Sequence, residues 1–160
     1  MAKDPDQMTD GEVRARILRL AFENSEELLE RFCEKLRAGL PPGTGVALRG
    51  SVITDERYKD SQPFDADGKG TSDLDVTLIG SEVMENWNKD AFYIPKLHTK
   101  PLGDEDPGAA PSLNPLRAEL QQMVKRPVNF QATANIVLFT RDVLFNQPYF
   151  TLIEAGAKDP

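Results

Sequence analysis

Two short stretches, LRGS at residues 48–51 and TSDLDVTL at residues 71–78, decide how this chain should fold. The first ends an apolar segment with a Gly-Ser turn, and the second is a strand pattern in which Asp73 and Asp75 stand two residues apart. Side chains alternate between the two faces of a β-strand. We therefore expect both aspartates on one face of the strand, and Leu74, Val76 and Leu78 on the other face, in a core.

The paired aspartates indicate a cation site. Two carboxylates held side by side on one strand repel each other unless a positive charge compensates them. Hard divalent ions such as Mg²⁺ prefer oxygen ligands and usually keep water molecules and substrate phosphates in their remaining positions. Gly50 and Ser51, at the turn from strand to helix, add backbone N–H groups and a hydroxyl that favour phosphate. The two stretches together predict neighbouring sites for Mg²⁺ and for phosphate.

The pattern GS at residues 50–51 followed by SDLD at residues 72–75 resembles the signature of the nucleotidyltransferase superfamily, which has the DNA polymerase beta-like fold. Within that superfamily the chain is most similar to the small stand-alone (minimal) nucleotidyltransferases, and the resemblance covers most of residues 44–157. It implies an α/β domain with a central mixed sheet flanked by helices. It also implies nucleotide-binding roles for Gly50, Ser51 and Ser72, and catalytic and metal-binding roles for Asp73 and Asp75.

The resemblance implies a transferase that moves a nucleotidyl group from a nucleoside triphosphate to an acceptor hydroxyl or phosphate, with two metal ions clamping the reacting oxygens. Three carboxylates normally hold the metals, and the third activates the acceptor. By position relative to the family's closing strand, the third falls at Asn135, with Asn129 as the alternative register. An amide carries no charge and is no base. The resemblance therefore implies an incomplete two-ion site with Asn135 as a degenerate third catalytic position.

The bulk composition fits one soluble domain. The chain has 160 residues, 39% of them hydrophobic and 28% charged, and no apolar run approaches the ~20 residues of a membrane span. Cys33, the only cysteine, excludes an internal disulfide and is typical of a reducing cytoplasm. The net charge of −7 argues against a broad basic surface for nucleic acid. We expect a cytoplasmic protein without a membrane contact.

The N-terminal third predicts helix. Residues 1–8 are polar and predicted to be disordered, and residues 9–160 are predicted to form a single domain. TDGE at residues 9–12 is a capping box that begins a helix extending to residue 39. The polar residues 24–26 could divide this helix in two. The following core is expected to contain strands at 46–48, 73–78 and 92–94 and helices at 52–59, 80–87 and 116–124.

The C-terminal third predicts strand and then helix. Residues 128–131 and 134–139 favour strand, either as two strands or as one with a bulge at 132–134. A short helix at 140–145 and a second helix that begins at 146–148 and closes at Gly156 are expected to follow.

Two polar segments leave alternatives open. Residues 61–70 predict a plain flexible loop rather than a Ca²⁺ loop, which would need a closing glutamate, and a flap over bound nucleotide is the other possibility. Lys96, His98 and Lys100 alternate, which suits either a basic rim for phosphates or a solvated sheet edge. His98 is the only histidine and has no serine or cysteine motif beside it, so nothing favours hydrolase chemistry.

Three hypotheses follow for function. The first is a Mg²⁺-dependent nucleotidyltransferase with an unknown acceptor, which binds a nucleoside triphosphate. The second is a catalytically impaired nucleotide-binding or regulatory pseudoenzyme, or an antitoxin-like partner protein, because the third carboxylate is an amide. The third is a globular α/β protein whose Asp-Leu-Asp is a solvated strand end. Because the larger relatives recognise acceptors with an added helical domain, a homodimer, a protein partner or further sequence beyond these 160 residues is expected to supply that surface here.

Overall fold

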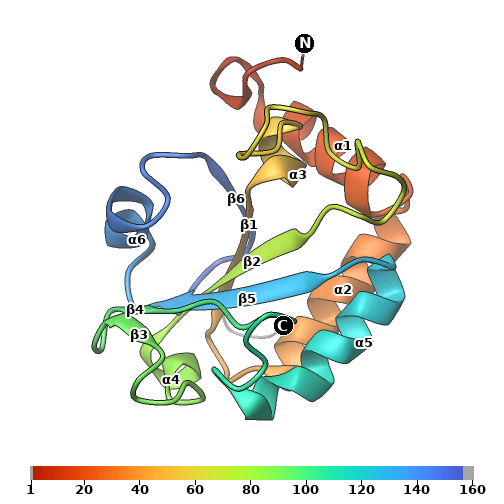
Figure 1. Cartoon of the computed structure of the whole chain (residues 1–160). Coiled ribbons are helices and arrows are strands. Elements are labelled where there is room, and N and C mark those ends of the chain that lie inside the picture. Colours follow the sequence, from red (N-terminus) through yellow and green to blue (C-terminus); the bar gives the residue numbers. More distant parts are fainter. Residues whose placement is uncertain (1, 157–160) are drawn as a thin grey trace.

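A computed structural model describes residues 2–156 of the chain, and Figure 1 shows a mixed sheet with helices on both sides. The strands are β1 (Gly45–Arg49), β2 (Leu74–Ile79), β3 (Phe92–Ile94), β4 (His98–Thr99), β5 (Val128–Thr133) and β6 (Tyr149–Ile153). The α-helices are α1 (Asp10–Ala21), α2 (Glu26–Gly39), α3 (Ser51–Thr54), α4 (Ser81–Met84), α5 (Asn114–Val124) and α6 (Ile136–Asp142). Short 3₁₀ turns lie at Pro5–Gln7 and Pro111–Leu113.

The six strands form one sheet in the order β3-β4-β5-β2-β1-β6. β2 and β5 are parallel, and the other pairs are antiparallel, so the sheet is mixed as the sequence predicts. The chain is therefore an α/β domain with an open mixed sheet. The neighbouring antiparallel strands β1 and β2 carry the two stretches LRGS and TSDLDVTL.

One face of the sheet is apolar and packs on helices. Leu74, Val76 and Leu78 of β2 are fully buried, as the alternation in the sequence predicts. They belong to a hydrophobic core that includes residues of α1, α2 and α5, which lie on the right of the sheet in Figure 1. The opposite face carries the polar residues of the central strands, and α6 lies on that side. The polar face of the sheet is therefore the one on which a functional site can form.

The predicted N-terminal helix is two helices, divided where the polar residues 24–26 stand. Thr9 and Glu12 form the predicted capping box at the start of α1, and Ser25 caps α2 through a hydrogen bond from the N–H of Leu28. Residues 2–8, for which the sequence predicts disorder, hold a 3₁₀ turn. The carbonyl of Lys3 there accepts a 2.8 Å hydrogen bond from the guanidinium of Arg16.

The predicted strand at 134–139 and the predicted closing helix at 146–156 are both wrong. Residues 136–142 form α6, because the side chain of Asn135 caps it by accepting a hydrogen bond from the N–H of Leu138 at 3.0 Å. The apolar run that follows Asn135 suits either strand or buried helix. Residues 149–153 instead form β6, which pairs with β1 and extends the sheet beyond it.

The helix after Gly50 is also shorter than predicted. It ends at Thr54, because Asp55 adopts a left-handed conformation with φ of 55° that closes the turn. The remainder of the predicted helix, to residue 59, is a loop that runs over the polar sheet face.

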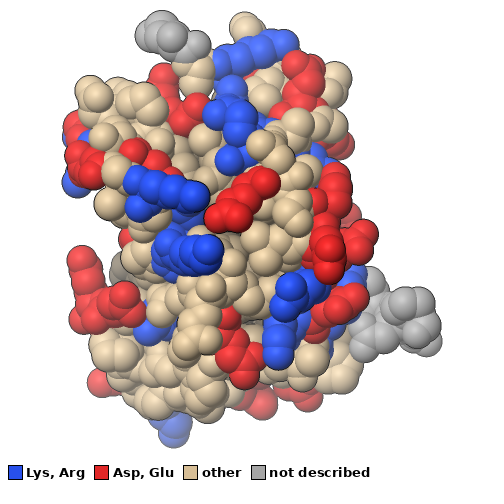
Figure 2. Space-filling model, turned by 90° about the vertical axis from the view of Figure 1, so that its right-hand side faces the viewer, with Lys and Arg blue, Asp and Glu red and all other residues tan. Residues whose placement is uncertain are grey.

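Acidic and basic side chains are intermingled over the face of the molecule shown in Figure 2. Among the described residues, no helix combines the length and the apolar character that crossing a membrane requires.

Candidate functional site

Asp75 lies in β2 and Asp73 directly precedes that strand, and both carboxylates lie on the polar face of the sheet beside Asn129. Strand pairing places Asp75 opposite Arg49 of β1 on one side and opposite Asn129 of β5 on the other. Because opposed residues in neighbouring strands share a face, one row across three strands brings an acid, a base and an amide together. The sequence alternation therefore places both aspartates as predicted.

The amide of Asn129 lies between the two carboxylates. Its Nδ2 donates hydrogen bonds to Oδ2 of Asp73 at 3.0 Å and to Oδ1 of Asp75 at 3.2 Å. Gly103 packs against the other side of the amide, where a Cβ would lie 2.5 Å from the Asn129 Oδ1. These contacts hold the amide in place, and the partial positive charge on its NH₂ group offsets part of the repulsion between the two carboxylates.

Asn135 does not belong to this site. It lies beyond the opposite end of β5, six residues after Asn129 and thus about 20 Å away along the strand direction. Its side chain caps α6 and is already hydrogen bonded. The choice of Asn135 as the third position depended on the predicted strand at 134–139, so that choice is wrong and the alternative register, Asn129, is the position beside the aspartates.

The site has an excess of negative charge. Partial burial raises the pKa of Asp73, and so do the neighbouring charges of Asp75, Asp104 and Glu105, while the hydrogen bond from Asn129 acts in the opposite direction. A carboxylate in this position is more stable when a proton or another cation is close. The electrostatics therefore favour cation binding at the two aspartates.

Arg49 is a positive charge that no carboxylate pairs with among the described residues. Its Nε donates to the hydroxyl of Thr77 at 3.0 Å and its Nη2 to the side-chain oxygen of Gln131 at 2.7 Å. Its guanidinium also lies 5.7 Å from the ring centre of Phe139. Burial lowers the pKa of Arg49 and Asp75 raises it. Because Thr77 and Gln131 are neutral, the guanidinium of Arg49 keeps its positive charge beside the aspartates and can bind an anionic ligand.

The Gly-Ser turn lies directly against the carboxylates. Gly50 has a φ of +82°, and a Cβ built on it would lie 2.9 Å from Oδ2 of Asp75. Only glycine allows both this backbone conformation and this close approach. Ser51 begins α3, which has a single turn, so a helix dipole adds little to the phosphate-binding groups expected from the sequence.

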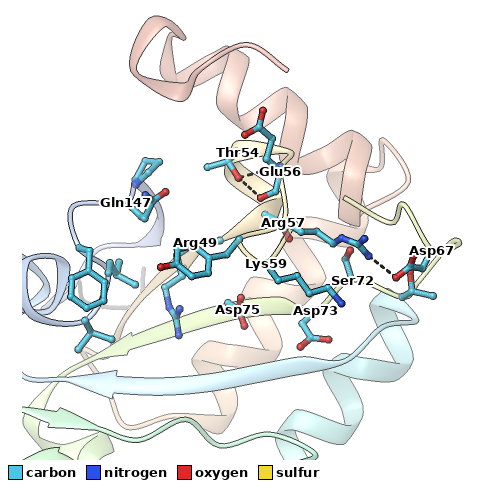
Figure 3. A pocket seen from close by; sticks show the side chains of 18 residues that line it. Arg49, Thr54, Glu56, Arg57, Lys59, Asp67, Ser72, Asp73, Asp75 and Gln147 are labelled. Carbon is cyan, nitrogen blue, oxygen red and sulfur yellow. Dashed lines mark hydrogen bonds and ion pairs between the residues drawn. The ribbon is translucent and has the colours of Figure 1, made fainter. Parts of the chain in front are cut away.

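A cavity of about 640 Å³ opens over the Gly-Ser turn and the two aspartates. Figure 3 shows Lys59 and Arg57 on the same side of β2 as Asp73 and Asp75. Arg57 is paired with Asp60 and Asp67, each at 2.6 Å. Lys59 takes part in no ion pair that the structure records for residues 2–156, so its ammonium is available to a ligand.

A second cavity, of about 610 Å³, lies on the β5 side of the same aspartates. It shares Arg49, Asp73 and Asp75 with the first cavity, and Asn129 and Tyr93 also line it. The two carboxylates therefore lie between the two cavities. This position would suit groups that hold two reactants close together.

Ser72 has a structural role that the sequence did not reveal. Its Oγ accepts a hydrogen bond from the N–H of Asp65 at 2.8 Å, and its own N–H donates to Oδ1 of Asp65 at 2.9 Å. Asp65 is also paired with the buried Arg126 at 2.8 Å, and Phe64 is buried beneath that guanidinium. The segment 61–70 is thus held at its middle, and Ser72 serves that attachment although it also borders the cavity.

His98 is buried and joins β4 to α6 rather than lining a phosphate rim. Its Nδ1 lies 2.9 Å from the hydroxyl of Thr133 and its Nε2 lies 2.9 Å from Oδ2 of Asp142. Hydrogen bonds from Arg141 and His98 lower the pKa of Asp142 to about 2. Lys100 lines the second cavity, whereas His98 is buried. The alternating residues 96, 98 and 100 therefore do not form one basic rim.

Comparisons of the chain with protein-family models, with curated proteins and with solved structures found no match. The assignment of a function therefore depends on the site. Within the part of the chain that the structure describes, no group of three or more His, Cys, Asp or Glu side chains gathers as a metal ligand set. The oxygen donors at the site are two carboxylates and one amide.

Sequence reasoning missed Arg49, Gln131 and the residues after α6 that line the first cavity. A signal for Gln131 was present, because Asn129, Gln131 and Thr133 alternate with apolar residues in the strand VNFQAT. That alternation predicts a polar face opposite the core. The residues after α6 gave no such signal, since their segment was assigned to the wrong elements.

Proposed function

We propose that this chain is a nucleotidyltransferase-type domain that binds a magnesium-complexed nucleoside triphosphate over Asp73 and Asp75 and transfers its nucleotidyl group slowly. The observation that carries the proposal is the row Arg49, Asp75 and Asn129 across three strands, with Asp73 beside it and the Gly50 turn in contact with it. This row would place a cation site, at the two aspartates, next to an anion site at Arg49.

The donor set fits Mg²⁺ in part. Asp73 and Asp75 would hold the ion through carboxylate oxygens, which hard cations prefer, and phosphates and water would complete its coordination. The raised pKa of Asp73 is consistent with this role, because it reflects partial burial of the carboxylate and, after that, negative charges close to it. When bound, the ion supplies charge neutralisation of the phosphates and polarises them as a Lewis acid.

The residues around the aspartates would bind the triphosphate. Lys59, which is exposed in the first cavity, and Arg49, whose partners are neutral, can each meet a phosphate oxygen. Gly50 gives the phosphates access to the backbone because it has no side chain. The second cavity, beyond the aspartates, would receive the acceptor.

Asn129 is the reason to expect weak transfer. A carboxylate at its position would add negative charge for a second metal ion and would help to deprotonate the attacking hydroxyl. The amide instead donates two hydrogen bonds to the aspartates. The same observation favours a second candidate, a nucleotide-binding regulatory protein without transferase activity that acts through a protein partner.

The test is a panel of four nucleoside triphosphates, with binding measured by calorimetry and transfer measured as pyrophosphate release. We expect Mg²⁺-dependent binding of at least one triphosphate by the wild-type protein and loss of that binding in Asp73→Ala and Asp75→Ala. Asp90→Ala is the matched control, because Asp90 is exposed and borders neither cavity. Folding of all variants is checked by circular dichroism.

The outcomes separate the two candidates and can refute both. Binding with slow pyrophosphate release supports the impaired transferase, and binding with none supports the regulatory protein. Equal triphosphate affinity in wild type and both aspartate variants would show that the aspartates are not the site and would leave them as a solvated strand end.

A further inference from the structure

The turn after α6 holds an aromatic side chain in an unfavourable backbone conformation. The N–H of Gln147 donates to the carbonyl of Leu144 at 3.0 Å, and the two central residues, Phe145 and Asn146, have φ of 51° and 64°. Such positive-φ turns favour Gly, Asn and Asp. Asn146 fits this preference, whereas Phe145 does not, because a bulky side chain strains a left-handed backbone.

The strain at Phe145 is not offset by burial. Its side chain is 74% exposed, while the preceding Leu144 is buried and anchors the turn. Both residues line the first cavity, which also contains Gly50 and the two aspartates. A strained conformation that the surrounding structure maintains at a cavity is a reason to look for a function.

A second exposed aromatic residue lines the same cavity from a different element. Tyr58, in the loop after α3, is 93% exposed. The side-chain amide of Gln147, which Figure 3 shows in the part of the cavity near α6, forms no hydrogen bond among the described residues, so it can both donate and accept. The cavity therefore combines aromatic faces and a free amide with the cation and phosphate groups of the proposed function.

We infer that Phe145 and Tyr58 form a stacking platform for the nucleobase of the bound triphosphate. The inference rests on the proposed function and adds the position of the base: it lies on the α6 side of the cavity, with the phosphates between it and the aspartates. A nucleobase has two apolar faces and a polar edge, which these aromatic rings and the Gln147 amide complement. Stacking accepts any of the bases, and the larger purines gain more binding energy from it than the pyrimidines do.

The test compares a nucleoside triphosphate with inorganic tripolyphosphate, which has the phosphates but no base. Phe145→Gly should weaken purine triphosphate binding roughly 5- to 150-fold, as loss of base stacking does, and leave tripolyphosphate binding unchanged. The same substitution should raise the melting temperature by roughly 2–4 °C, because glycine relieves the strain at positive φ. Phe145→Asn, which also suits positive φ, should behave in the same way, and Phe145→Trp should retain binding.

Val137→Ala is the control, because Val137 is 70% exposed on α6 and does not line the cavity. Higher stability together with weaker nucleotide binding in Phe145→Gly would support the platform. Unchanged purine triphosphate affinity in Phe145→Gly and in Tyr58→Ala would overturn it. Equal wild-type affinity for tripolyphosphate and for the nucleotide would overturn it as well, while leaving the phosphate site intact. If the wild-type protein binds neither compound, the proposed function itself fails and the platform falls with it.

Discussion

Asn129→Asp replaces the amide between the two aspartates by a third carboxylate. In the wild-type protein the Nδ2 of Asn129 donates to Asp73 at 3.0 Å and to Asp75 at 3.2 Å. The substitution keeps the shape of the side chain but turns a donor into an acceptor and adds a negative charge. It therefore tests whether the position can complete a site with three acids.

The magnitude follows from these two contacts. A hydrogen bond to a charged group contributes roughly 1.5–3 kcal/mol, and both such bonds are lost. Two charges about 3 Å apart repel by about 5 kcal/mol at an effective dielectric constant of 20, so the cluster takes up a proton instead of remaining fully ionised. Because solvent screens this half-exposed site, we expect a net loss of about 2–4 kcal/mol in the free energy of unfolding at neutral pH without metal.

Mg²⁺ should reverse this loss. A ligand at a hundred times its dissociation constant stabilises the folded state by about 2.7 kcal/mol, and 1 kcal/mol corresponds to roughly 2–4 °C for a domain of this size. We expect the melting temperature of Asn129→Asp to fall by about 5–15 °C in chelator and to rise by about 5–10 °C with saturating Mg²⁺. Any transfer activity should rise by ~10²–10⁴-fold, which is the usual contribution of a general base.

Asn135→Asp is the matched control. It adds the same charge about 20 Å away, and aspartate caps a helix as well as asparagine does. Its stability and its response to Mg²⁺ should both be close to those of the wild type. The reasoning is refuted if Asn129→Asp melts like the wild type in chelator and gains no more from Mg²⁺ than Asn135→Asp does.

Two further predictions concern the turn beside the site and the stability at low pH. Gly50→Val should abolish triphosphate binding in calorimetry and lower the stability by about 1–2 kcal/mol, since its Cβ would lie 2.9 Å from Asp75 Oδ2 at a φ of +82°. Gly156→Val, with a similar φ of +80° and no atom within 4 Å of its Cβ, should show the strain without the binding loss, and intact binding in Gly50→Val would contradict the site. Hydrogen bonds lower the pKa of Asp142 from 3.8 to about 2, so its contribution to stability is present above pH 4 and is lost as the pH falls from about 4 to about 2. Urea midpoints of Asp142→Asn should therefore fall less than those of the wild type across that range, and parallel curves would contradict this assignment.

The sequence by itself determined the central strands and the side on which the aspartates lie. The alternation SDLDVTL has one solution for a strand with a buried face, because a shift by one residue would bury both acids and expose Leu74, Val76 and Leu78. The same holds for the capped helix α1, whose Thr9 and Glu12 satisfy each other's backbone locally. These features depend on contacts within a few residues, so local chemistry is sufficient to predict them.

Only the tertiary structure decided which residue stands beside the aspartates. The run IVLF after Asn135 suits strand and helix equally, and its choice of helix depends on the cap at Asn135 and on burial of Phe139 against the polar face of the sheet. Residues 149–153 become β6 because β1 can accept a partner along its open edge. With that topology fixed, the parallel pairing of β2 and β5 places Asn129 opposite Asp75. Pairing between strands more than fifty residues apart is a property of the whole fold, and no local pattern contains it.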